Sequence, residues 1–185
     1  MVSLTTPVCN FDAPAIDFEL PDAYKKMWNL EKAKGQNGTL IAFICNHCPY
    51  IKAILPRLVE DVRKLKDEYG VNTVAIMSND QSLNEEDSTE NMIRISEEMD
   101  FSFPYLIDET QEIAKAYGAV CTPDFFGFSK DMTLQYRGRF DESRKETSPE
   151  GVRRDLLEAM QQIAKTGQGP LEQIPSMGCS IKWKN

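Results

Sequence analysis

The 185-residue sequence has a single histidine, and its basic residues are outnumbered by acidic ones. The net charge of −8 argues against nucleic acid or an anionic membrane as the main partner. No apolar run approaches the roughly 18 residues that a membrane span requires. The first seven residues have neither a basic region nor an apolar core, so they predict no signal peptide. We therefore expect a cytoplasmic protein with no membrane or nucleic-acid partner.

A disulfide framework and a zinc-type cluster of cysteines are also missing. The chain has five cysteines, an odd number, and Cys9, Cys121 and Cys179 are dispersed. Structural zinc sites need about four ligands, usually as two close pairs, and this sequence has one such pair. His47 has no partner carboxylate that the sequence identifies. We therefore predict no catalytic triad, no metal and no bound cofactor.

The feature that stands out is a Cys-x-x-Cys motif formed by Cys45 and Cys48. It follows the apolar run 39–44 and precedes a helical run that starts near Tyr50. At such a junction, unpaired backbone N–H groups and the helix dipole stabilise a thiolate. We expect this thiolate at Cys45, with Cys48 about one helical turn further on, within reach of an internal disulfide.

The sequence pattern around the motif alternates between strand and helix. Residues 39–44 and 71–77 are mostly apolar, as in strands that are buried on both faces. Apolar residues at spacings of three and four over 51–65 predict an amphipathic helix, with a kink at Pro56 and Gly70 as its C-cap. This order predicts an α/β fold, a mixed central sheet flanked by helices.

The chain is interpreted as one domain, 1–185, with an N-terminal arm (1–38), a core (39–166) and a C-terminal tail (167–185). Further local signals are two short strands and a short helix in the arm, a helix cap at Ser88, a hairpin over 125–139, and a last helix that starts at Ser148-Pro149. Asp108 and Gln111 form a capping box at the start of a helix that Gly118 ends.

Charged residues outside the motif are interpreted as surface groups. The acidic stretch 85–87 predicts a solvated loop. Arg137 and Arg139 alternate on the predicted hairpin, so they should share one face and pair with surface acids.

The motif resembles that of the thioredoxin fold when it is considered together with Thr122 and Pro123. In that fold a Thr-Pro pair precedes a strand, and its proline is cis and faces the dithiol. The resemblance implies that Thr122 and Pro123 lie opposite Cys45 and Cys48 and present a backbone edge to the substrate chain. Cys121 is either a small apolar strand residue or a third thiol near enough to exchange with the dithiol.

A closer resemblance covers nearly the whole chain. It rests on Phe-Ile-Cys-Asn-His-Cys-Pro-Tyr at 43–50, Ser-Asn-Asp at 78–80, Phe-Pro-Tyr-Leu-Ile-Asp-Glu-Thr-Gln-Glu at 103–112, Ala-Tyr-Gly-Ala-Val-Cys-Thr-Pro-Asp at 116–124 and Gly-Cys-Ser-Ile-Lys-Trp-Lys at 178–184. These segments resemble a bacterial and archaeal group of thioredoxin-like proteins of the redoxin class. That class includes the peroxiredoxins, which are alkyl hydroperoxide reductase and thiol-specific antioxidant proteins. Because the tail is part of the resemblance, Cys179 is expected to pack against the domain, with a resolving role as the alternative.

Asn46 and His47 distinguish the motif from ordinary thioredoxin, which has Gly-Pro between its cysteines. A histidine before the second cysteine resembles the oxidising bacterial disulfide-forming proteins, and an imidazole there favours a thiolate at Cys45. This would make the disulfide more oxidising, whereas a cytosolic location favours reduction. Both directions of electron flow therefore stay open.

Comparison with the peroxiredoxins suggests a second assignment of the cysteines. Peroxiredoxins have Thr-x-x-Cys-Pro where this chain has Cys45, Cys48 and Pro49, so Cys48 matches their peroxidatic cysteine. They also have an arginine near the strand that begins here around Phe125. We find no arginine next to Thr122 in this region, which argues against a peroxidase.

We predict a thiol-disulfide oxidoreductase in which Cys45 attacks a substrate disulfide and Cys48 resolves the mixed disulfide. The expected site consists of Cys45 and Cys48, supported by Asn46, His47, Pro49, Thr122 and Pro123, with Cys121 as a possible third thiol. The substrate would be a disulfide-containing protein or a small-molecule thiol, and a reductase or glutathione would donate electrons. One alternative is a thiol peroxidase with Cys48 peroxidatic and Cys45 resolving. Another is a non-catalytic module that binds a soft metal through the motif.

Overall fold

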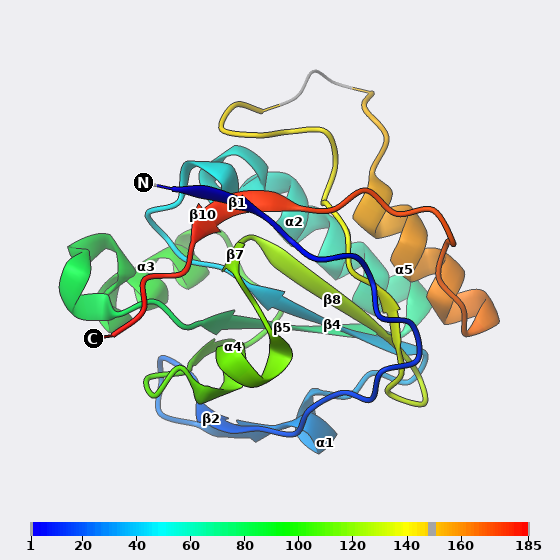
Figure 1. The fold of residues 1–185 in the computed structure, drawn as a ribbon. Coiled ribbons are helices and arrows are strands. Elements are labelled where there is room, and N and C mark those ends of the chain that lie inside the picture. Colours follow the sequence, from blue (N-terminus) through cyan, green and yellow to red (C-terminus); the bar gives the residue numbers. More distant parts are fainter. Residues whose placement is uncertain (1, 148–150, 185) are drawn as a thin grey trace.

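The centre of the molecule is a five-stranded mixed sheet with the strand order β6-β5-β4-β8-β9 (Figure 1). The structure is a computed structural model that describes residues 2–147 and 151–184. The strands are β4 (Gly38–Phe43), β5 (Val71–Met77), β6 (Tyr105–Ile107), β8 (Asp124–Ser129) and β9 (Leu134–Tyr136). The central strand β4 runs parallel to β5 and antiparallel to β8. The predicted α/β fold with a mixed central sheet is confirmed.

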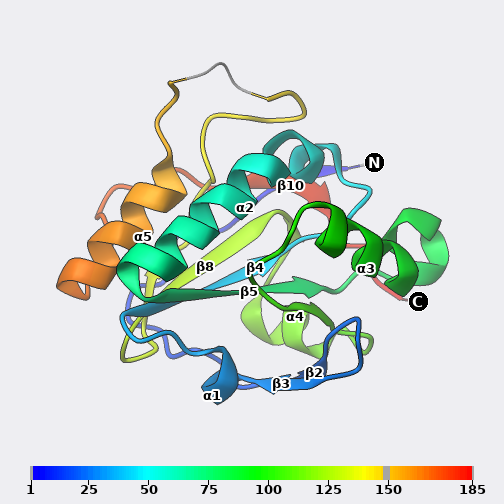
Figure 2. The same cartoon turned by 180° about the vertical axis from the view of Figure 1, so that it is seen from behind.

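Helices cover both faces of this sheet, as Figure 2 shows from behind. One face carries α2 (Pro49–Tyr69) and α5 (Asp155–Thr166), and the other carries α4 (Glu112–Tyr117), α1 (Leu30–Ala33) and the hairpin of β2 (Glu19–Pro21) and β3 (Met27–Asn29). Alternate side chains of β4 point to opposite faces of the sheet. Leu40 packs in the hydrophobic cluster with α2 and α5, whereas Ile41 packs in the hydrophobic cluster with α4. A strand buried on both faces needs an apolar residue at nearly every position.

A polar segment connects β5 to α3 (Thr89–Glu98) through two short 3-10 helices, η1 (Gln81–Leu83) and η2 (Glu85–Asp87). The Ser88 side chain accepts a hydrogen bond from the Asn91 N–H, which confirms Ser88 as the N-cap of α3. In the part of the chain that the structure describes, no helix is both long enough and apolar enough to cross a membrane.

Two predicted helix ends are confirmed and one helix start is wrong. Gly70 and Gly118 end α2 and α4 in the left-handed conformation, and α2 continues through Pro56. The capping box is wrong, because α4 begins only after Gln111 and the Gln111 side chain instead donates to the carbonyl of Ser78. Ser148-Pro149 lies outside the described residues. The last helix, α5, begins at Asp155, later than expected, because residues 151–154 before it are not helical.

A second, three-stranded sheet joins the two ends of the chain beside the central sheet. Strand β10 (Met177–Ser180) lies between β1 (Ser3–Thr5) and β7 (Cys121–Thr122), and both pairings are antiparallel (Figure 1). Strand β7 leads directly into β8 of the central sheet. The C-terminal tail is thereby brought to the segment that faces the dithiol.

Candidate active site

The dithiol lies in the short connection between β4 and α2. The Ile44 N–H still donates to the Ile76 carbonyl, at 3.1 Å, so the chain leaves the sheet only just before Cys45. Cys48 is the N-cap residue of α2, and Pro49 occupies the first helical position, where its missing N–H removes no helical hydrogen bond. Both cysteines are fully buried. The helix therefore begins next to Cys48, close to the start expected near Tyr50.

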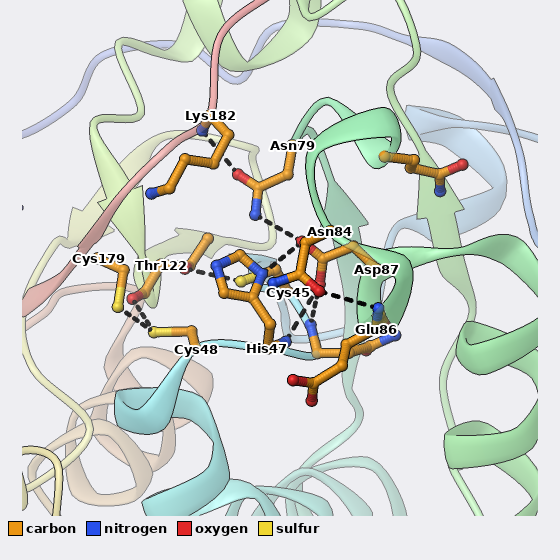
Figure 3. Close-up of polar contacts among 12 residues, drawn as sticks. Cys45, His47, Cys48, Asn79, Asn84, Glu86, Asp87, Thr122, Cys179 and Lys182 are labelled. Carbon is orange, nitrogen blue, oxygen red and sulfur yellow. Dashed lines mark hydrogen bonds and ion pairs between the residues drawn. The ribbon is translucent and has the colours of Figure 1, made fainter. Parts of the chain in front are cut away.

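Thr122 contacts both cysteines of the motif (Figure 3). Its Oγ1 lies 3.2 Å from Cys45 Sγ, and its carbonyl oxygen lies 3.1 Å from Cys48 Sγ. The Thr122–Pro123 peptide bond is cis, as the resemblance to thioredoxin implies. Strand β7, however, is already paired with β10, with Thr122 opposite Cys179. A backbone edge that was expected to be available to a substrate chain is thus occupied within the protein.

Asp87 is the residue of the candidate site that the sequence analysis missed, because the stretch 85–87 was expected to be a solvated loop. Its carboxylate is fully buried, and Oδ2 lies 2.6 Å from His47 Nδ1 (Figure 3). Oδ1 accepts hydrogen bonds from the backbone N–H groups of Asn46 and His47, at 2.9 and 3.1 Å, and Asn79 Nδ2 donates to Oδ2. The available signal was a carboxylate in a helical turn after β5, where sites of α/β proteins often lie.

Asn46 is fixed from two sides by the surrounding loop and sheet. Its Nδ2 donates to the Glu86 carbonyl at 2.9 Å, and its Oδ1 accepts a hydrogen bond from the Tyr105 hydroxyl at 3.1 Å. Since both residues between the cysteines are buried and hydrogen-bonded, the loop has a defined conformation.

The two thiols of the motif differ in acidity. The hydrogen bond from the Cys45 thiol lowers the pKa of Cys48 to about 5, with a further contribution from the Cys179 thiol, although burial and the Thr122 carbonyl favour the protonated form. Burial raises the pKa of Cys45 well above its usual value, and the hydrogen bond with Cys48 and the charge of Asp87 raise it further. The hydrogen bond between the two thiols and the burial of Cys45 therefore favour a thiolate at Cys48 rather than the one expected at Cys45.

The carboxylate of Asp87 is held in its charged form by its neighbours. Burial alone would raise its pKa, but hydrogen bonds from His47 and Asn79 more than offset this and lower it. A negative charge is therefore fixed beside the motif, on the side of Cys45.

Cys179, rather than Cys121, is the third thiol at the dithiol. Cys179 Sγ lies 2.9 Å from Cys48 Sγ (Figure 3). The Cys121 thiol instead faces the Pro123 carbonyl at 3.6 Å, and burial raises its pKa. Cys9 is half-buried and lies near Arg137, away from the motif. The sequence analysis weighed a resolving role for Cys179 only as an alternative, because the path of the tail has no local signal.

Arg137 is the arginine that the structure places beside β8. It makes a two-point ion pair with the buried Asp124, with Nε–Oδ1 and Nη2–Oδ2 distances of 3.2 and 2.9 Å. The expected pairing of Arg137 with a surface acid is therefore wrong, because its partner lies in the sheet; Arg139 pairs with Asp155 at the start of α5. Among the described residues, no arginine contact to Cys48 is seen.

Three donor atoms for a metal lie together at the motif. Cys45 Sγ, a ring nitrogen of His47 and a carboxylate oxygen of Asp87 all lie within 4.8 Å of one another. Both oxygens of this carboxylate already accept hydrogen bonds, Oδ1 from the Asn46 N–H and Oδ2 from Asn79 Nδ2. Binding a metal would break this network, so the donor set fits a metal less well than it fits a structural role.

Two solved structures are similar to the chain over almost its entire length. One is the crystal structure of an uncharacterized conserved protein from Geobacillus kaustophilus, with 40% identity and a TM-score of 0.92 over 100% of this chain and 97% of that one. The other is a hypothetical protein from Sinorhizobium meliloti 1021, with 35% identity and a TM-score of 0.86 over 98% and 97%.

More distant structures share the thioredoxin-like fold. A secreted disulfide oxidoreductase from Mycobacterium tuberculosis superposes with a TM-score of 0.57 at 14% identity, over 80% of this chain and 94% of that one. No curated protein sequence matches the chain. The AhpC/TSA family model matches residues 11–137, well over half of the chain. The thioredoxin-like fold and this match show that the chain belongs to the AhpC/TSA family.

Proposed function

We propose that the protein is a thiol-disulfide oxidoreductase with Cys45 and Cys48 as its redox pair. The observation that carries the proposal is the contact of both sulfur atoms with one residue, Thr122, at the cis peptide bond. The fold is shared with the Mycobacterium tuberculosis disulfide oxidoreductase and with a thiol:disulfide interchange protein from Chlorobium tepidum. This agrees with a dithiol function at the same junction of strand and helix.

Cys48 is assigned as the attacking thiolate because its pKa is the lower of the two. Its sulfur forms a bond with one sulfur of the substrate disulfide, and the other substrate sulfur leaves as a thiolate. Cys45 then gives up its proton and attacks Cys48 Sγ, which releases the second substrate thiolate and leaves a Cys45–Cys48 disulfide. The Cys45 proton ends on one substrate thiolate, the other is protonated by water, and two electrons pass from the protein to the substrate.

The substrate class is a disulfide-containing protein or a small disulfide, in a cytoplasmic setting where glutathione or a reductase restores the dithiol. Both sulfur atoms are fully buried, so attack requires local opening of the segment around them. Such opening would favour substrates whose disulfide lies in an extended chain that can be inserted, compared with substrates whose disulfide lies on a compact surface.

Serine variants test both the function and the assignment of roles. Reduced wild type should reduce insulin disulfides in the presence of glutathione, whereas Cys48→Ser should neither reduce them nor form a mixed disulfide. Cys45→Ser, combined with Cys179→Ala to remove the thiol next to Cys48, should lose turnover yet still form a mixed disulfide at Cys48, which mass spectrometry would locate. Mixed disulfides that form only in Cys48→Ser would make Cys45 the nucleophile, and full activity of both variants would refute the redox pair.

A second candidate function, thiol peroxidase, is supported by the acidity of Cys48 at the helix N-terminus. Cys48 would be oxidised to a sulfenic acid by a peroxide, and Cys45 would condense with it to form a disulfide and water. Stopped-flow mixing of reduced protein with hydrogen peroxide discriminates the two. Rapid formation of a sulfenic acid or disulfide at Cys48 supports the peroxidase, and a rate no better than that of a free thiol rejects it.

A further inference from the structure

We propose that Cys179 is a third redox residue, which takes over the disulfide from Cys45 to form a Cys48–Cys179 disulfide. This inference deepens the proposed function and rests on it for its role in turnover. The two sulfur atoms lie 2.9 Å apart, whereas a disulfide bond is about 2.0 Å long. In Figure 3 the Cys48 side chain points toward Cys179, and the Cys45 thiol also forms a hydrogen bond with Cys48. Cys48 is thereby placed to bond with either neighbour.

The strand β10 holds Cys179 in this position from both sides. Cys179 is opposite Thr122 of β7 and opposite Ser3 of β1, so its backbone is fixed within a three-stranded sheet. Gly178 allows the close approach, because a Cβ atom at this position would overlap the carbonyl oxygen of Thr122. The same carbonyl contacts Cys48, so β10 packs directly against the dithiol.

This arrangement is that of an extended chain docked beside the cis-proline. β10 runs antiparallel to β7 and carries a cysteine at the residue opposite Thr122. In this protein the C-terminal strand therefore takes the place that the sequence analysis assigned to a substrate chain, and Cys179 takes the place of that chain's reactive sulfur.

The exchange needs no external oxidant. Starting from the Cys45–Cys48 disulfide, Cys179 Sγ forms a bond with Cys48 Sγ, the Cys45–Cys48 bond breaks, and its electron pair goes to Cys45 Sγ. The proton of the Cys179 thiol moves to Cys45, so atoms, charge and oxidation level are conserved. The exchange runs in reverse when Cys45 Sγ attacks Cys48 Sγ of the Cys48–Cys179 disulfide and Cys179 leaves.

Oxidation of the Cys45→Ser variant tests whether the second disulfide forms. Diamide, which removes two electrons and two protons from a pair of thiols, is added to the reduced variant, and non-reducing peptide mapping locates the cross-link. We expect a Cys48–Cys179 disulfide within the monomer, lost in Cys45→Ser/Cys179→Ala. The matched control, Cys45→Ser/Cys121→Ala, removes another buried cysteine of the same sheet and should retain it.

A second variant addresses the position of the strand rather than the thiol. Gly178→Ala keeps all five cysteines, but its added Cβ pushes β10 away from Thr122, so we expect about tenfold slower formation of the Cys48–Cys179 disulfide in the Cys45→Ser background. Circular dichroism confirms that each variant is folded. Absence of the cross-link in folded Cys45→Ser, or its equal loss in the Cys121 control, would overturn the proposal.

The insulin assay separates this inference from the proposed function. A wild-type protein that reduces insulin but forms no Cys48–Cys179 disulfide would overturn only the third redox residue. A protein that forms this disulfide but reduces no substrate disulfide would overturn only the oxidoreductase.

Discussion

His47 Nδ1 lies 2.6 Å from Oδ2 of Asp87, although 40 residues separate them along the chain. The same carboxylate binds the backbone N–H groups of residues 46 and 47. The loop between β4 and α2 cannot satisfy these groups by itself, and a buried N–H without a partner is strongly disfavoured. Asp87 therefore determines the conformation in which the dithiol is held, and His47 is one of the groups that it anchors.

Replacing Asp87 by asparagine should destabilise the fold. Oδ2 of Asp87 accepts a hydrogen bond from Asn79 and faces His47 Nδ1. An asparagine with its NH2 group in this place could not accept the hydrogen bond from Asn79. We expect Asp87→Asn to lower the free energy of unfolding by about 1–3 kcal/mol in urea titrations. Glu86→Gln is the matched control, because Glu86 pairs with Lys52 at the surface and should change stability little. Equal stabilities of the two variants would contradict the anchoring role of Asp87.

The acidity of Cys48 should be visible as a pH transition in the reduced protein. A thiolate absorbs near 240 nm, so absorbance should rise as pH increases through about 5, and this step should be missing in Cys48→Ala. The pKa of Cys48 in the folded protein lies below the usual value of 9.0, so ionisation of Cys48 stabilises the reduced fold. This stabilisation is fully present above pH 9.0 and is lost as the pH falls through about 5. A first thiol transition above pH 8 would refute this assignment.

The Thr122 hydroxyl should tune the potential of the dithiol. Its Oγ1 lies within hydrogen-bond distance of Cys45 in the reduced form, so Thr122→Val removes an interaction of about 1 kcal/mol. We expect the disulfide potential to become more negative by roughly 20 mV, measured against glutathione. Thr73→Val is the control, because the buried Thr73 hydroxyl has no hydrogen-bond partner among the described residues. A shift in the control as large as that in Thr122→Val would rule out a specific role of the hydroxyl.

Removing Arg137 should leave an uncompensated charge in the sheet. Burial raises the pKa of its partner Asp124 to about 6 even though Arg137 lowers it, so the carboxylate depends on the guanidinium. We expect Arg137→Met to lower the free energy of unfolding at pH 7 by about 3–5 kcal/mol. Because the folded pKa of Asp124 lies above its usual value, this loss should become smaller as pH falls and the carboxylate is protonated.

Arg63→Met, which removes an exposed ion pair with Asp100, is the control for Arg137→Met. Both side chains reach solvent, so Arg63→Met should change stability by less than about 1 kcal/mol and show little dependence on pH. A similar loss in both variants, measured by urea unfolding at pH 5 and pH 7, would contradict the buried character of the Arg137–Asp124 pair.

Most of the regular structure could be predicted from local sequence. The apolar strands β4 and β5, the amphipathic face of α2 and the glycine that ends it all follow from side-chain periodicity and backbone preference. The start of α4 could not be predicted, because Gln111 adopts a left-handed conformation and uses its side chain in contacts with residues 78 and 182. Such distant contacts override a local capping signal.

The sequence by itself determined the dithiol and its place at a strand–helix junction, since these depend on a short motif and on the order of strands and helices. The cis-proline segment opposite the dithiol was implied by the resemblance to the thioredoxin fold. Only the tertiary structure decided which groups surround the sulfur atoms. Asp87 reaches His47 through a polar turn without periodicity, and Cys179 reaches Cys48 across 131 residues through the pairing of β10 with β7. Strand pairing and buried hydrogen bonds between distant segments depend on how the whole chain packs, which no local pattern encodes.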